Sequence, residues 1–221
     1  MGAFNIEDQL TFYGSYHNNK VNVLIHIICV PMILASSILM LSNFVLTDFV
    51  PQSSIGACIA VVGERVPGFV DRSIIVNVAQ ALLTFLTSPF ANAGFLVAVI
   101  YSTFYCALDF MVGLMSSLAL IQASVKSVEL LAWDSRTATK YALIVHIACW
   151  IAQFIGHGVF EGRSPALFDS LLQSLTLAPF FVVYEILFSL GYRRDLHKRV
   201  MNRVGKNILQ FRKAHPKRRK E

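Results

Sequence analysis

The stretch from Tyr141 to Pro165, YALIVHIACWIAQFIGHGVFEGRSP, places ionisable residues inside an otherwise apolar run. With about 100° between successive residues of an α-helix, His146, Gln153 and His157 fall within about 20° of one another. Glu161 follows His157 by four residues and lies on nearly the same face. Ionisable side chains at membrane depth are costly unless they pair, bind a metal or line a cavity. The stripe therefore predicts a functional site, with simple hydrogen bonds from each histidine to a neighbouring helix as the alternative.

The composition predicts a membrane protein. Of 221 residues, 55% are hydrophobic and 14% are charged, and the mean hydropathy is +0.58. This is more apolar surface than a soluble domain of this size needs. Besides the stretch quoted above, runs that approach or exceed membrane length are Val21–Leu46, Phe95–Ala123 and Phe168–Tyr192. We expect an all-α fold, a polytopic membrane helical bundle of about four to five spans with a basic C-terminal tail.

Charge separates the C-terminus from the rest of the chain. Residues 193–221 contain 12 Lys and Arg against two acidic residues, a net of +10, whereas residues 1–192 have a net charge of −4. A basic segment directly after an apolar run follows the positive-inside rule, so we expect residues 193–221 to be a cytosolic tail. Only Phe211 interleaves an aromatic ring with the late charges, so we expect no nucleic-acid partner.

Residues 47–92 interrupt the apolar runs. Residues 47–73 combine prolines, glycines and charged residues, which marks a loop. The apolar segment Ile74–Leu86 is short and ends before Pro89, which favours an interfacial or re-entrant helix, with a true span as the alternative. We therefore interpret residues 47–92 as a loop or re-entrant segment within a membrane-embedded domain of residues 1–192.

Prolines, a glycine and an acidic residue occur inside the predicted spans. Pro31 is expected to kink the first span, and Pro179 is expected to break the last one. Asp109 and Gly113 lie near the middle of Phe95–Ala123, which is long for one crossing. That run is either one tilted helix or a tight helical hairpin.

A second pair of histidines lies at the start of the first span. His17 and His26 flank Asn22, which is one helical turn before His26. Histidines on two segments, with the carboxylates of Glu161, Glu185 and Asp109 as candidate neighbours, suit an imidazole-bound iron. Zinc could use the same ligands. A hydrolytic zinc site, however, normally presents a polarised water to an aqueous cleft, which this apolar setting does not favour.

Helix geometry limits how these histidines can act together. On straight helices His146 and His157 would lie about 16 Å apart, and His17 and His26 about 14 Å apart on opposite faces. One ion with bonds near 2 Å cannot hold both members of either pair. Either the helices break, at Gly156 and before the first span, or some histidines only orient the ligands. Two stacked bis-imidazole haems are a third alternative, although such haems usually draw on four histidine-bearing segments rather than two.

Two blocks of sequence resemble the fungal 2-hydroxy fatty acid dioxygenase family. They are FYGSYHNNKVNVLIHIICVP (12–31) and WIAQFIGHGVFEGRSPALFDSLLQSLTLAPFFVVYEILFSLG (150–191). The patterns Y-H-x4-N-x3-H-x4-P and Q-F-x-G-H-x3-E-x-R-x-P-A are both complete. Residues 47–92 look like a loop or re-entrant insertion relative to smaller members of this family. The resemblance implies a multi-pass enzyme of the endoplasmic-reticulum membrane. Such an enzyme uses Fe(II) and O2 to shorten 2-hydroxy fatty acids by one carbon in phytosphingosine breakdown.

In this interpretation residues 1–192 are the catalytic domain, and the iron ligands or their close neighbours are His17, His26, His146 and His157. The side chains expected to orient the imidazoles are Asn22, Gln153, Glu161 and Glu185. We favour this orienting role for Glu161 over direct ligation. Arg163 would receive the substrate carboxylate as a bidentate partner, or else is an ordinary interfacial anchor. The competing function is a non-enzymatic membrane transporter of metal ions or protons that uses the same histidines.

Overall fold

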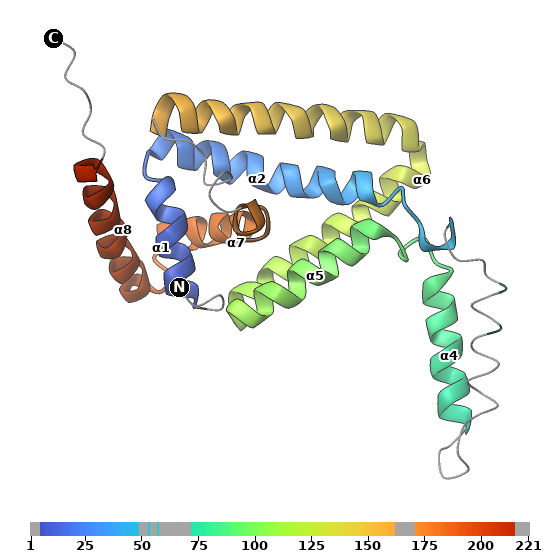
Figure 1. Cartoon of the computed structure of the whole chain (residues 1–221). Coiled ribbons are helices and arrows are strands. Elements are labelled where there is room, and N and C mark those ends of the chain that lie inside the picture. Colours follow the sequence, from blue (N-terminus) through green and yellow to red (C-terminus); the bar gives the residue numbers. More distant parts are fainter. Residues whose placement is uncertain (1–4, 49–52, 54–56, 58–71, 162–170, 215–221) are drawn as a thin grey trace. The chain divides into compact units, whose positions relative to one another are not determined.

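The computed structural model of the chain describes residues 5–48, 53, 57, 72–161 and 171–214. The helices are α1 (Ile6–Tyr16), α2 (Lys20–Leu41), the short 3-10 helix η1 (Leu46–Asp48), α4 (Arg72–Leu86), α5 (Ala93–Leu108), α6 (Phe110–Ile155), the π-helix η2 (Gly156–Glu161), α7 (Leu171–Ser189) and α8 (Arg194–Ala214). Figure 1 labels the α-helices. Within these described ranges, β-type pairing is limited to an isolated antiparallel bridge between Val45 and Asn92. The predicted all-α fold is confirmed.

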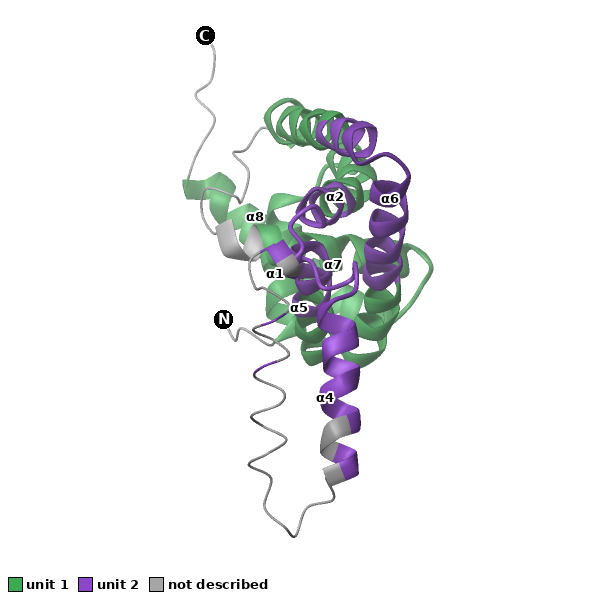
Figure 2. Ribbon diagram, turned by 90° about the vertical axis from the view of Figure 1, so that its right-hand side faces the viewer, with its two compact units in different colours: residues 1–34, 101–118, 144–221 green, residues 35–100, 119–143 purple. Residues whose placement is uncertain are grey.

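The chain forms two compact units, coloured separately in Figure 2. Unit 1 contains residues 1–34, 101–118 and 144–221, and unit 2 contains residues 35–100 and 119–143. Unit 1 therefore includes both histidine-bearing segments together with α7 and α8. The basic segment after the last apolar helix is part of this packed unit.

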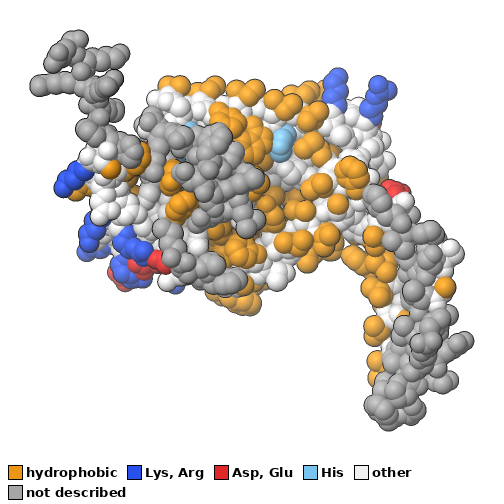
Figure 3. All heavy atoms as spheres, viewed as in Figure 1, with side chains coloured by type: hydrophobic (Ala, Val, Ile, Leu, Met, Phe, Trp, Pro, Cys, Tyr) orange, Lys and Arg blue, Asp and Glu red, His pale blue; other side chains and the backbone are white. Residues whose placement is uncertain are grey.

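Some helices are long and apolar enough to cross a membrane. These are α2 and the continuous run of α6 and η2, with mean hydropathies of 2.4 and 1.7. A third candidate is the bent pair Leu175–Ser189 and Arg194–Ala214, which meet at 116°. By length and composition, the described residues thus contain two spans, or up to three if the bent pair counts as one. Hydrophobic side chains gather over α2 and α6 on the face drawn in Figure 3, as expected of a lipid-facing surface. The larger number of four to five spans stays a prediction.

The long apolar run that begins at Phe95 is a helical hairpin rather than one tilted helix. Asp109 separates α5 from α6 with an extended backbone (φ −154°, ψ 111°), and its side chain caps α6 by accepting from the Val112 N–H at 3.2 Å. A Cβ at Gly113 would lie 2.4 Å from the backbone nitrogen of Cys106, so the tight return of the chain requires glycine there.

Helix α6 is interrupted at Asp134. The backbone of Asp134 is non-helical (φ −155°, ψ 92°), so residues 110–133 and 135–155 are two successive helices. The carboxylate of Asp134 accepts from the Thr137 N–H at 3.0 Å and thereby starts the second helix. The break lies within the polar segment Lys126–Lys140.

The two prolines inside the spans do not end their helices. Pro31 lies within α2 and Pro179 within α7. The prediction that Pro179 breaks the last span is therefore wrong, since α7 runs without interruption from Leu171 to Ser189. A proline removes only one backbone donor, and packing against neighbouring helices commonly compensates for that loss in apolar helices.

Helix α8 packs along α1. Its residues Leu196, Val200 and Val204 are buried, and a Cβ at Gly14 of α1 would lie 2.9 Å from a methyl carbon of Val204. Ion pairs accompany this contact, including one of 3.0 Å between Glu7 and Arg199. The described part of the basic segment thus forms an amphipathic helix, Arg194–Ala214, whose apolar face packs within unit 1.

Candidate metal centre

Three of the predicted histidines converge in unit 1. Candidate ligand atoms of His17, His26 and His157 all lie within 4.8 Å of one another. The three side chains are buried, with exposed fractions of 8%, 3% and 5% respectively. Their ring centroids are 4.5 to 4.8 Å apart in edge-to-face arrangements, which leaves no space for a haem macrocycle between them. Imidazoles at this spacing could hold one metal ion after small inward shifts, because metal–nitrogen bonds of about 2.1 Å place ligand nitrogens about 3–4 Å apart.

Helix breaks bring these residues together. Residues 17–19 separate α1 from α2, so His17 and His26 do not lie on one straight helix. At the other segment the α-helix changes to a π-helix over Gly156–Glu161, which carries His157. Single π-turns inside α-helices occur frequently at functional sites. The first of the alternatives left open by the sequence, broken helices, thus applies to the pair of His17 and His26.

Hydrogen bonds fix the tautomers of two of the histidines. The Nδ1 atoms of His17 and His26 lie 2.9 Å from the backbone carbonyl oxygens of Tyr13 and Asn22 respectively. A carbonyl oxygen can only accept, so each Nδ1 carries the proton and each Nε2 keeps its lone pair. This is the usual arrangement of histidines that bind metals through Nε2.

The protonation and pairing of the centre also fit a metal. Burial, and next the neighbouring His26, lower the pKa of His17 well below its ordinary value, so His17 is neutral as a ligand must be. The Nδ1 atom of His157 is buried and has no hydrogen-bond partner among the described residues. A buried polar atom without a partner calls for an explanation, and a bound metal supplies one.

Asn22 and Gly156 hold the two segments close together. Asn22 is fully buried, and its Nδ2 donates to Glu161 at 3.3 Å. A Cβ at Gly156 would lie 2.5 Å from Oδ1 of Asn22, so the start of the π-helix can approach α2 only because it has no side chain there. The backbone carbonyl of Asn22 orients His26, whereas the side chain of Asn22 contacts the π-helix η2.

Glu161 binds the backbone of the turn between α1 and α2. Its carboxylate accepts from the N–H groups of Asn18 at 3.2 Å and Asn19 at 2.9 Å, in addition to the side chain of Asn22. The N–H groups at the start of a helix lack partners within the helix and lie at the positive end of its dipole. Glu161 therefore caps α2 from another segment, and this contact ties the backbone around His17 to the π-helix that carries His157.

His146, Gln153 and Arg163 were also predicted as site residues. His146 does not belong to the histidine cluster, and its Nε2 accepts from the Trp150 indole N–H at 3.0 Å. Gln153 is buried four residues before His157. Arg163 lies outside the described residues.

The two remaining carboxylates have different surroundings. Asp109 caps α6, accepts from the Tyr184 hydroxyl at 2.8 Å and pairs with Arg193, so it belongs to the connection between α6 and the end of α7. Glu185 is half-buried on α7 and lines a pocket that also contains His17.

Tyr13 is a member of the site that sequence analysis did not single out. Its ring stacks on His17 with centroids 3.9 Å apart, and its buried hydroxyl has no hydrogen-bond partner among the described residues. Burial, and next the charge of Glu185, raise the pKa of Tyr13 well above its ordinary value. The available signal was its position four residues before His17, one turn away on the same helix face.

Comparison with known proteins identifies the family. The family described as "2-hydroxy-palmitic acid dioxygenase Mpo1-like" matches residues 3–190. This chain belongs to the Mpo1-like family. A curated relative, the 2-hydroxy-palmitic acid dioxygenase MPO1 of Saccharomyces cerevisiae, is 34% identical over 193 residues, which cover 86% of this chain and 84% of the relative. No solved structure matches significantly. The family resemblance drawn from the two sequence blocks is confirmed, and the matched range includes all three clustered histidines.

Proposed function

We propose that this Mpo1-like chain is an Fe(II)-dependent dioxygenase that shortens 2-hydroxy fatty acids by one carbon, within phytosphingosine breakdown in the endoplasmic-reticulum membrane. The observation that carries the proposal is the convergence of His17, His26 and His157 in a chain of this family. Three imidazole ligands leave open positions on an octahedral ion, as non-haem iron enzymes that activate O2 require.

The overall reaction balances without a second reductant. A 2-hydroxy acid and O2 give the acid one carbon shorter, CO2 and water. All four electrons that reduce O2 come from the substrate, so neither a nicotinamide nor 2-oxoglutarate is required. The sequence is compatible with this, since it contains no glycine-rich dinucleotide-binding fingerprint.

Residues of the chain would bind, orient and shield the reacting groups. Iron(II) in this site would supply the redox chemistry that allows the substrate to react with O2. The imidazoles of His17, His26 and His157 would hold it, and the carbonyl of Asn22 keeps His26 in the tautomer that binds through Nε2. Burial of all three rings excludes bulk water from the centre. The membrane lipid and apolar spans would surround the acyl chain.

We further propose four to five membrane crossings and a cytosolic C-terminus. The break at Asp134 supports this topology, because it divides residues 110–155 into two helices that meet in a charged segment. The net +10 of residues 193–221 supports the orientation. A glycosylation acceptor appended after Glu221 should stay unmodified in cells, and its modification would overturn the orientation.

The activity is tested with the full chain purified in detergent. O2 consumption and the chain-shortened acid are measured with 2-hydroxyhexadecanoate after chelation and after reloading with Fe(II) or Zn(II). We expect one O2 consumed per acid formed, with activity restored by Fe(II) and not by Zn(II). Equal activity in the chelated protein would contradict the proposal.

A further inference from the structure

A pocket of about 600 Å³ lies in unit 1 beside His17. It is bounded by α1, α2, α7 and α8, and its volume falls in the range of ordinary ligand sites, about 300–1,000 Å³. Most of its wall is apolar, including Leu10, Val23, Ile27, Phe181, Phe188 and Val200. Such a wall suits a hydrocarbon chain, and His17 places the pocket next to the histidine cluster.

Polar groups with unused bonding capacity enter the same pocket. The hydroxyl of Tyr13 is buried without a hydrogen-bond partner among the described residues. Lys20, three residues after His17, is exposed, and the structure records no ion pair between it and another described residue. The carboxylate of Glu185 likewise has no hydrogen-bond or ion-pair partner within the described ranges. The pocket therefore offers a hydroxyl donor, a cation and an anionic acceptor.

Two further side chains of the wall, Tyr184 and His197, make contacts of their own. The Tyr184 hydroxyl donates to Asp109 at 2.8 Å, so this residue contributes its ring. His197 stacks on Phe188 with centroids 4.4 Å apart and an interplanar angle of 13°. Tyr13, Lys20 and Glu185 supply the hydroxyl donor, the cation and the anion of this wall, beside the side-chain amide of Asn18 and the ring nitrogens of His197.

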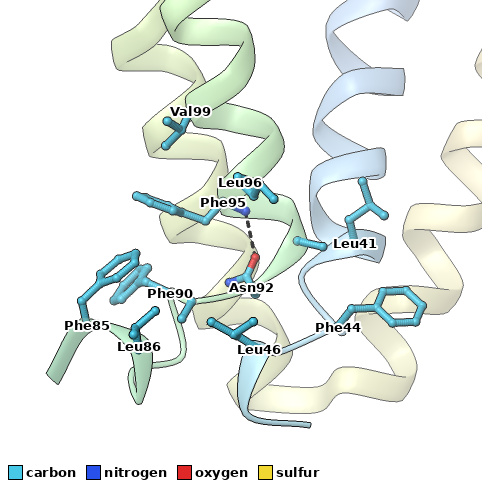
Figure 4. A pocket seen from close by; sticks show the side chains of 12 residues that line it. Leu41, Phe44, Leu46, Phe85, Leu86, Phe90, Asn92, Phe95, Leu96 and Val99 are labelled. Carbon is cyan, nitrogen blue, oxygen red and sulfur yellow. Dashed lines mark hydrogen bonds between the residues drawn. The ribbon is translucent and has the colours of Figure 1, made fainter. Parts of the chain in front are cut away.

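The second large pocket provides a contrast. It has a volume of about 570 Å³, lies in unit 2 and is lined by Leu, Phe, Val and Ala side chains together with Asn92 (Figure 4). Asn92 accepts from the Phe95 N–H at 2.8 Å and donates to the Pro89 carbonyl at 2.7 Å. This pocket has apolar volume but no spare polar group, so it cannot select a head group.

We propose that the unit 1 pocket is the substrate site, in which Lys20 pairs with the substrate carboxylate, Glu185 accepts a hydrogen bond from the 2-hydroxyl group, and the apolar wall holds the acyl chain. The inference rests on the proposed function and deepens it. A 2-hydroxy acid presents an anion and a hydroxyl donor on adjacent carbons, which complement an ammonium and a carboxylate. The Tyr13 hydroxyl donates to a carboxylate oxygen. Lys20 thereby takes the role that sequence analysis gave to Arg163.

The test measures ligand binding to metal-free protein, so that iron chelation by the ligand does not contribute. The full chain is purified in detergent and treated with a chelator. Three probes are compared: 2-hydroxyhexadecanoate, hexadecanoate without the hydroxyl group, and hexadecane-1,2-diol without the carboxylate. Iron loading of each variant afterwards shows that the fold around the histidines is intact.

Lys20→Met should weaken binding of both acids about tenfold to a hundredfold and leave diol binding unchanged, as expected when one charge-assisted contact is lost. Glu185→Leu should abolish the preference for 2-hydroxyhexadecanoate over hexadecanoate. Lys140→Met and Glu129→Leu are the matched controls, since both residues lie on α6 and neither lines this pocket, and they should bind all probes normally. If Lys20→Met fails to load iron, Lys20→Gln takes its place.

Unchanged acid binding in the iron-competent Lys20 variant would overturn the inference, as would a loss of acid binding in Arg163→Met alone. The proposed function is judged separately, by O2 consumption of iron-loaded wild-type protein. Active wild-type enzyme with unaffected Lys20 and Glu185 variants would refute the substrate site and leave the function standing. Head-group selection by Lys20 and Glu185 without O2 consumption would refute the function and support a fatty-acid site.

Discussion

Two clusters of polar residues lie within the apolar unit 1, and they differ in how completely their bonding groups are used. At the connection of α6 and α7, Asp109 accepts from Val112 and Tyr184 and pairs with Arg193. At the histidine cluster, by contrast, buried atoms of three residues have no partner among the described residues: Tyr13, Asn22 and His157. Because a buried polar group without a partner is costly, the first cluster is complete in itself, and the second requires a ligand.

The comparison explains why similar sequence signals have different meanings. Asp109 and Glu185 both appear as single acidic residues in apolar runs. In the structure Asp109 stabilises a helix start, whereas Glu185 faces a pocket. Only the surrounding hydrogen bonds distinguish a structural carboxylate from one that is available to a substrate.

The largest expected effect follows from removal of a clustered imidazole. Single changes His17→Ala, His26→Ala and His157→Ala should each lower iron content or activity at least about tenfold, as losses around metal centres commonly do. His146→Ala is the matched control within the stretch Tyr141–Pro165, because His146 lies outside the cluster. Iron analysis and O2 consumption check this, and equal losses in all four variants would erase the distinction between cluster and control.

The next effect concerns the close approach of the π-helix to α2. Gly156→Ala would place a Cβ 2.5 Å from Oδ1 of Asn22, so we expect a lower iron content and a loss of stability of about 1–3 kcal/mol, as overpacking typically causes. Gly158→Ala is the control, since its Cβ would meet no atom of the described residues within 4 Å. Thermal unfolding and iron analysis of both variants measure the difference, and identical behaviour would argue against this packing.

Glu161→Gln should produce a smaller and more selective change. Glutamine keeps one acceptor oxygen but places an NH2 group against the N–H donors of Asn18 and Asn19, so the turn that carries His17 would be held less firmly. We expect iron to be retained and turnover to fall about tenfold, within the range for residues that support metal ligands. Activity that returns only at high added Fe(II) would instead identify Glu161 as a direct ligand.

Tyr184→Phe should cause the smallest loss of stability, and it tests the cluster of Asp109, Tyr184 and Arg193. It removes one donor to Asp109 and leaves Arg193 and the α6 cap in place. We expect a loss of about 1 kcal/mol, measured as a lower midpoint of thermal unfolding, with unchanged iron content. Loss of iron in this variant would show that the two clusters are not independent.

Sequence reasoning reached the helical class and the two histidine segments, because apolar length and motif spacing are local properties. It did not separate His146 from His157, since both lie on one face of an ideal helix. The π-helix that begins at Gly156 carries His157, whereas His146 lies earlier on α6 and is not in the cluster. The predicted break at Pro179 was wrong because the effect of a proline also depends on its surroundings. Helix α7 continues through Pro179, as a helix can when neighbouring segments compensate for the one missing backbone N–H donor.

The roles of Glu161 and Tyr13 depend on contacts that no local pattern contains. Glu161 binds main-chain N–H groups more than 140 residues away. Because nearly every residue has such an N–H group, the sequence does not indicate which ones Glu161 will bind. Tyr13 is placed by the packing of α1 on α7, where its ring lies 4.7 Å from that of Phe181. Interfacial aromatic residues and buried site residues have the same local sequence signature.

The central claim is that His17, His26 and His157 together bind one iron. The most direct measurement is the iron content of wild-type protein and of the variant with all three replaced by alanine, both purified in detergent and reloaded with Fe(II). We predict one iron per wild-type chain and none above background in the triple variant, while His146→Ala keeps one. Retention of a full equivalent of iron by the triple variant would contradict the claim.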